Sequence, residues 1–157
     1  MDLVITGVVA GVIGTLVMDA LNLLFARAGI LTKIDVAMIG RMAVGWTRGR
    51  FSYGHPNEME SVEHELFYGY LAHFTIGIAL AVPFVLGWGT FVEGPISPVW
   101  AVAYGLATTV ASHFLVLPSM GLGVCGMRSP EGTKLALSSL ANHLFYGIGI
   151  ASGVALW

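Results

Sequence analysis

Four long apolar segments constrain this chain more than any other feature of its sequence. They cover residues 3–26, 66–90, 98–118 and 135–157. A helix needs about 20 predominantly apolar residues to cross a hydrocarbon core of about 30 Å, and each segment reaches that length. The sequence therefore predicts an all-α protein, with residues 1–157 forming a single domain in which four membrane-spanning helices make a bundle.

The composition favours the same environment. Of the 157 residues, 56% are apolar and 10% are charged, whereas soluble domains carry about 25% charged residues. The net charge of −2 and the lack of a Lys/Arg block argue against nucleic acid as a partner. The single cysteine, Cys125, excludes an internal disulfide and a thiolate zinc site. We therefore expect a lipid bilayer as the surroundings of this chain.

The basic residues predict an orientation for the four segments. All seven Lys and Arg residues lie between the first and second segments or between the third and fourth. Short loops rich in Lys and Arg stay in the cytoplasm, so both termini are expected on the non-cytoplasmic side. Trp88, Trp100 and Trp157 gather at that opposite side, as in an interfacial aromatic belt.

One further helix is expected in the first cytoplasmic loop, residues 28–60. The stretch from Val36 to Trp46 alternates apolar and small residues around Arg41. This pattern predicts a short interfacial helix on the inner leaflet, with Arg41 and Trp46 at the headgroups. The alternative is a loop without regular structure.

Matching motifs indicate an internal repeat. The second and fourth segments share His-x3-Gly, and the Thr-x3-Asp of the first corresponds to a Thr-x3-His in the third. The matched pairs are His73–Gly77 with His143–Gly147, and Thr15–Asp19 with Thr109–His113. We interpret the two helical hairpins as diverged copies in a parallel repeat, related by an axis along the membrane normal. Chance similarity between glycine-rich helices is the alternative.

Small residues four positions apart lie on one helix face and let helix backbones approach closely. Such spacing predicts helix-packing positions at Gly7, Gly11, Thr15, Gly69, Gly77, Gly105, Thr109, Ser139 and Gly147. A second set of glycines is expected on outer faces, where it would mediate a homodimer or contact a partner membrane subunit. This set is Gly87, Gly89, Gly147, Gly149 and Gly153.

Four ionisable residues lie on the predicted packing faces: Asp19, His73, His113 and His143. At about 1.5 Å per residue, each is about 8–12 Å inside the cytoplasmic end of its segment. Ionisable side chains within a membrane are costly, and they normally face the bundle interior and carry function. We therefore expect the four to form one polar layer, which is the candidate functional site.

Several chemistries fit such a layer. Three imidazoles and one carboxylate would complete the ligand set of a transition metal, and His73 with His143 would be the natural axial pair for haem. Histidine also titrates near neutral pH, so the layer would carry protons or a small cation with Asp19 as counter-charge. The structural alternative is that these groups hydrogen-bond to each other and to Ser112, Asn142 and Asn22, and only specify helix packing.

Several short motifs together resemble a known family. They are Gly-Arg and Arg-Gly-Arg-Phe in the first loop, Leu-Ala-His-Phe-x3-Gly in the second segment, Pro-Ser-Met-Gly-Leu-Gly followed by Arg-Ser-Pro, and the late His-x3-Gly. Over nearly its whole length the chain resembles the small bacterial four-span inner-membrane proteins grouped as a domain of unknown function. The resemblance implies a multi-pass protein of the bacterial inner membrane, and it implies no activity or cofactor.

The leading functional hypothesis is a membrane protein whose Asp/His layer binds a transition metal or haem, or carries protons or small cations, as the core of a minimal transporter or redox subunit. The alternative is a non-catalytic membrane scaffold or accessory subunit. A hydrolytic enzyme is the third and least favoured alternative, because no nucleophile with a positioned base is visible. Ser112 and His113 do not qualify, since adjacent helical residues point in different directions.

Overall fold

The computed structural model describes residues 2–92 and 94–156. Its helices are α1 (Leu3–Arg27), α2 (Val36–Thr47), α3 (Glu65–Phe91), α4 (Pro98–Ala111), α5 (Leu117–Ser119) and α6 (Thr133–Val154). A π-helical turn, Ser112–Val116, joins α4 to α5, and short 3-10 turns lie at Pro56–Glu58 and Val124–Gly126. These described residues contain no strand, so the all-α prediction is confirmed.

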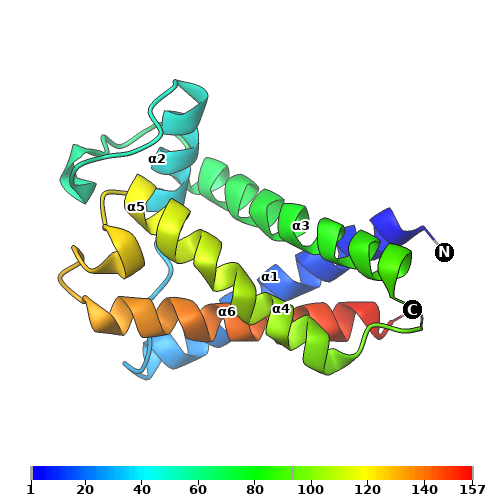
Figure 1. Cartoon of the computed structure of the whole chain (residues 1–157). Helices are drawn as coiled ribbons and strands as arrows, with labels where there is room; N and C mark the ends of the chain where they lie inside the picture. Colours follow the sequence, from blue (N-terminus) through cyan, green and yellow to red (C-terminus); the bar gives the residue numbers. More distant parts are fainter. Residues whose placement is uncertain (1, 93, 157) are drawn as a thin grey trace.

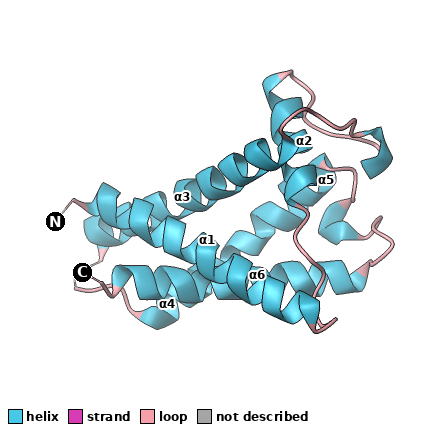
Figure 2. Cartoon of the chain, turned by 180° about the vertical axis from the view of Figure 1, so that it is seen from behind, coloured by secondary structure: helices cyan, strands magenta, loops and turns pink. Residues whose placement is uncertain are grey.

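The long helices run up and down in chain order, with both termini at the same end of the molecule (Figure 1). Helix α1 packs against α3 on one side and against α6 on the other, and α6 packs in turn against α4. The helices therefore form the spatial series α3, α1, α6, α4. In the described chain α3 and α4, the two ends of this series, touch at few points. Seen from behind, α1 lies beside α6, with α3 on its other side (Figure 2).

Three of the described helical runs are long and apolar enough to cross a membrane: α1, α3 and the continuous run Pro98–Ser119. Helix α6 has 22 residues, but its polar residues lower its mean hydropathy. Ser138, Ser139 and Asn142 on α6 are buried in the bundle, because this helix lies between α1 and α4. Its polar side chains thus face protein, which explains why hydropathy alone marks it less clearly.

The end of the bundle opposite the termini is built from α2 and the two long connections (Figure 1). Helix α2 occupies the segment for which a short helix was expected; its position at a membrane surface stays a prediction. Arg41 on α2 donates to both carboxylate oxygens of Glu65 on α3, at 2.7 and 3.0 Å, and this hydrogen bonding raises the pKa of Arg41. A buried apolar cluster beneath α2 comprises Met42, Met59, Leu117, Met120 and Leu122.

Glycines permit close backbone contact within both hairpins. A Cβ atom placed on Gly11 of α1 would lie 2.7 Å from the Cα of Ile78 on α3. A Cβ on Gly105 of α4 would overlap the backbone of Gly147 on α6. Of the other expected packing positions, Gly7 lies against Val82, Gly77 against Thr15, Gly69 against Val36 of α2, and Ser139 against Ser112, while Thr109 is buried.

The expectation that a set of glycines faces outward is wrong for three of them. A Cβ on Gly149 would lie 2.6 Å from the Cα of Gly14, and one on Gly153 would lie 2.7 Å from the Cα of Ala10. Both contacts belong to the seam between α1 and α6, and Gly147 is buried against α4. These glycines therefore pack inside the bundle, because α6 is its central helix and has close neighbours on two sides.

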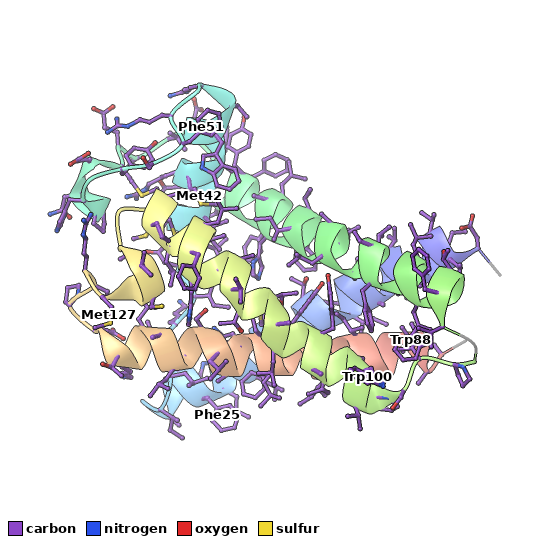
Figure 3. The ribbon with its side chains drawn as sticks, in the orientation of Figure 1. Phe25, Met42, Phe51, Trp88, Trp100 and Met127 are labelled. Atoms are coloured by element: carbon purple, nitrogen blue, oxygen red, sulfur yellow. The ribbon has the colours of Figure 1, made fainter. Side chains whose placement is uncertain are left out.

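Aromatic side chains join α3 and α4 near the end that carries the termini. Trp88 and Trp100 lie beside the α3–α4 connection (Figure 3), with ring centroids 6.4 Å apart. Trp157, the third residue of the expected aromatic belt, lies outside the described residues.

Candidate functional site

A cavity of about 440 Å³ lies between α3, α4 and α6. Its walls come from His73–Leu80 on α3, from Thr108–Val116 on α4 and the π-helical turn, and from Leu135–Tyr146 on α6. Residues Thr32–Ile39 border it near α2. This volume falls within the range of about 300–1,000 Å³ that is typical of small-molecule sites.

Tyr104 on α4 contacts α3 next to the cavity, at Leu80. The Tyr104 ring stacks on Phe84 of α3 with centroids 4.4 Å apart, and its hydroxyl donates to the carbonyl of Leu80 at 2.6 Å. The crossing of α4 with α3 thus carries a tyrosine, whereas glycines at the other seams allow backbone contact. The aromatic stack also joins the two helices between the cavity and the termini.

Asp19 and His73 form the most strongly polar contact of the candidate site. The Nε2 of His73 on α3 lies 2.9 Å from the Oδ1 of Asp19 on α1, and their side chains are 12% and 26% exposed, respectively. A carboxylate oxygen only accepts, so His73 donates through Nε2. The imidazole of His73 lines the cavity, whereas Asp19 does not. Asp19 thus fixes the orientation of this imidazole through the hydrogen bond.

The wall formed by α4 and α6 carries two hydrogen-bonded pairs. Thr108 Oγ1 lies 2.7 Å from His143 Nδ1, and one helical turn along, the hydroxyls of Ser112 and Ser139 lie 2.9 Å apart. All four residues line the cavity. Residues four apart on a helix share a face, so the two pairs lie one helical turn apart along the same seam between α4 and α6. These four residues are called the polar ladder, and each hydrogen-bonded pair is one rung of it.

His113 does not join this arrangement. It lies in the π-helical turn, and its Nε2 is buried without a hydrogen-bond partner in the described chain. A π-helical turn inserts an extra residue into an α-helix, so it changes the direction of the side chains that follow. The four-residue spacing from Thr109 to His113 assumed a regular α-helix, which explains the difference.

The expected Asp/His layer is therefore divided. Asp19 pairs with His73, His143 bonds to Thr108, and the Nε2 of His113 has no hydrogen-bond partner among the described residues. Within residues 2–92 and 94–156 no three His, Cys, Asp or Glu side chains are grouped so that they could hold a metal ion. The residues do not supply the donor set that a metal centre would need.

Part of the polar network has the structural role that was the alternative hypothesis. Asn22 Nδ2 donates to Asn142 Oδ1 at 3.0 Å and to the carbonyl of Thr32 at 2.9 Å. Asn22 Oδ1 accepts from the backbone N–H of Ile34 at 3.1 Å. This amide thus fixes the connection that follows α1 to the bundle, and it leaves the Asn142 amide nitrogen as a donor on the cavity wall.

Sequence reasoning missed two residues that shape the site. Thr108 precedes the predicted Thr109 by one position, and its polarity within an apolar segment was the available signal. Tyr104 gave no signal, because an aromatic residue in an apolar segment is ordinary. Its role depends on which helix it meets, and the sequence does not state that.

The comparisons with known proteins agree with the sequence-based resemblance. Residues 8–156 match the protein family described as "Protein of unknown function (DUF2938)". No curated protein and no solved structure matches the chain. Because the match covers nearly the whole sequence, the chain belongs to the DUF2938 family.

Proposed function

We propose that this chain is a four-span membrane protein that binds a small, mostly apolar molecule in the cavity between α3 and α4. The observation that carries the proposal is the cavity itself, about 440 Å³ in volume and lined by apolar side chains around a few convergent polar groups. This combination is typical of ligand sites. The polar groups on α3, α4, the π-helical turn and α6 include His73, Thr108, Ser112, Ser139, Asn142 and His143, and the connections contribute the charged side chains Lys33, Asp35 and Glu131.

The four spans are α1, α3, the run Pro98–Ser119 and α6. Helix α6 has 22 residues, which is long enough to cross a hydrocarbon core, and it packs against two of the other spans. All seven basic residues lie at the end that carries α2, so this end is cytoplasmic under the positive-inside rule. The membrane is then the bacterial inner membrane that the family resemblance suggests.

Support for two related hairpins comes from equivalent contacts. Under the sequence repeat, the pair of α1 and α3 corresponds to the pair of α4 and α6, and each pair packs closely at a glycine, Gly11 and Gly105. The tight seam between α1 and α6 then corresponds to the open side between α3 and α4. At the position equivalent to Ala10 in the tight seam, the open side has Tyr104.

The native cysteine offers a direct test of this topology. We expect a membrane-impermeant maleimide to label Cys125 only after cells are permeabilised, because Cys125 lies at the α2 end and is partly exposed. In a Cys125→Ser background, Leu156→Cys should label on intact cells, since Leu156 follows α6 and is 67% exposed. Labelling of both cysteines from the same side would contradict the crossing of the membrane by α6.

Photoaffinity labelling in lipid nanodiscs tests the binding function. A medium-chain alcohol that carries a diazirine is expected to label cavity residues such as Ile76 and Val116 saturably, with competition by unlabelled decanol. Ala111→Phe should reduce this labelling at least about tenfold, because Ala111 lines the cavity and an overfilled site excludes a ligand. Ala107→Phe is the matched control: Ala107 is one turn earlier, exposed and outside the cavity lining.

The opposite result would favour the scaffold hypothesis. If the label reached only lipid-facing positions such as Leu71, and decanol did not compete, the cavity would have no ligand and the polar groups would only specify packing. A metal centre held by three or more side chains is not part of the proposal, because no such group of His, Cys, Asp or Glu occurs among the described residues. The Asp19–His73 pair supports proton transfer as a second candidate, since it places a carboxylate oxygen 2.9 Å from an imidazole nitrogen.

A further inference from the structure

We infer that the ligand of this cavity has a hydroxyl head group, which donates a hydrogen bond to His143 and accepts one from the neighbouring amide or hydroxyls. The inference rests on the proposed binding function and specifies the chemistry of the ligand. It follows from assigning the donor and the acceptor of each hydrogen bond in the polar ladder between α4 and α6.

The proton of Thr108 fixes the tautomer of His143. Thr108 Oγ1 lies 2.6 Å from the carbonyl oxygen of Gly105, and two oxygens at that distance need a proton between them. A carbonyl oxygen only accepts, so the hydroxyl donates to Gly105. Its single proton is then used, and Thr108 accepts from His143 Nδ1 at 2.7 Å. Neutral His143 therefore carries its proton on Nδ1.

The other ring nitrogen of His143 is consequently an acceptor. A neutral imidazole has one N–H and one lone pair, which places the lone pair on Nε2. No hydrogen bond within the described residues uses this atom, and it is not among their buried unpaired polar atoms. Because His143 lines the cavity, Nε2 is available to a donor group on a ligand.

Donors lie on the same wall. The Asn142 carbonyl oxygen accepts from Asn22, which leaves its amide N–H groups for other partners. The Ser112–Ser139 contact consumes one hydroxyl proton and leaves the second. A head group that binds here must both donate and accept. A hydroxyl does both, whereas an ether only accepts and an ammonium group only donates.

The remaining lining defines the rest of the ligand. Side chains of Met18, Ile76, Leu80, Val116 and Leu117 border the cavity, and an apolar ligand body that covers them gains hydrophobic stabilisation. Opposite the ladder, α3 contributes one ionisable group, His73, which is already paired with Asp19. Lys33, Asp35 and Glu131 also line the cavity; with two carboxylates and one ammonium group, this lining has no excess of positive charge for a fatty acid anion. The site thus fits an uncharged amphiphile, and the structure assigns it to a long-chain or ring-bearing alcohol.

A pair of matched competitors tests the assignment. Decanol and decyl methyl ether have the same alkyl chain, and they differ in whether the oxygen carries a proton. In the photoaffinity assay with wild-type protein, we expect decanol to compete at least about tenfold more strongly than the ether. His143→Phe should remove this difference, because it removes the acceptor. His143→Gln should retain part of it, because the amide oxygen also accepts.

The outcomes separate this inference from the function on which it rests. Equal competition by alcohol and ether in the wild-type protein, with saturable cavity labelling, would overturn the hydroxyl assignment and leave the binding function intact. An absence of saturable cavity labelling would overturn both. The wild-type comparison needs no variant, so a folding defect in His143→Phe does not affect it.

Discussion

Gly105→Val is expected to lower the free energy of unfolding by about 3 kcal/mol, the upper part of the range for overpacked sites. A Cβ at this position would overlap the backbone of Gly147 and lie 2.7 Å from the carbonyl oxygen of His143. Backbone atoms of a packed helix cannot move aside as a flexible side chain can. Helices α4 and α6 would therefore separate, and the two polar rungs between them would break.

The measurement is unfolding by SDS in mixed micelles, followed by circular dichroism. Gly87→Val is the matched control, since a Cβ at Gly87 in α3 has no neighbour within 4 Å; its effect should stay within about 0.5 kcal/mol. If the two variants were equally stable, the close contact between α4 and α6 would be wrong. Gly105→Ala should have a smaller effect of the same sign, because it adds only the Cβ.

Asp19→Leu is expected to cost about 2 kcal/mol of stability, because it leaves the Nε2–H of His73 without its partner in a largely apolar interface. Replacing both residues by leucine should cost less than either single change, since no polar group is then left unpaired. This is a double-mutant cycle, and its coupling energy isolates the contribution of the pair.

Conservative variants separate packing from charge. Asp19→Asn retains an oxygen that accepts from His73 and should keep most of the stability. If Asp19→Asn retained stability but lost ligand labelling, the charge of Asp19 would matter for function. Additive single and double effects in the same SDS titration would show that the 2.9 Å contact contributes nothing measurable.

Much of the helical framework could be predicted because apolar length and small-residue spacing are local signals. The four apolar segments coincide closely with α1, α3, the run Pro98–Ser119 and α6. Positions such as Gly11 and Gly105 were assigned to packing faces from a four-residue spacing, and the structure places them at helix seams. Such signals depend on residues within one or two turns of the same helix.

What could not be predicted depends on which helix meets which. Gly149 and Gly153 were assigned to an outer face because the sequence does not reveal that α6 has close neighbours on two sides. His113 was assigned to the polar layer because a π-helical turn has no reliable sequence signal. The cavity was missed for the same reason, since its walls come from α3, from α4 and the π-helical turn, and from α6, which meet only in the folded structure.

The order of the helices also limits how this molecule can change shape. Helices α1 and α6 form a stiff central pair because Gly14 meets Gly149, and Ala10 meets Gly153, at backbone distance. Helices α3 and α4 each attach to this pair through one long seam, and the hydrogen bond from Tyr104 to Leu80 joins their free sides. A molecule wider than the resting gap would therefore have to part α3 from α4 rather than α1 from α6, and its entry between them would break the hydrogen bond from Tyr104 to Leu80.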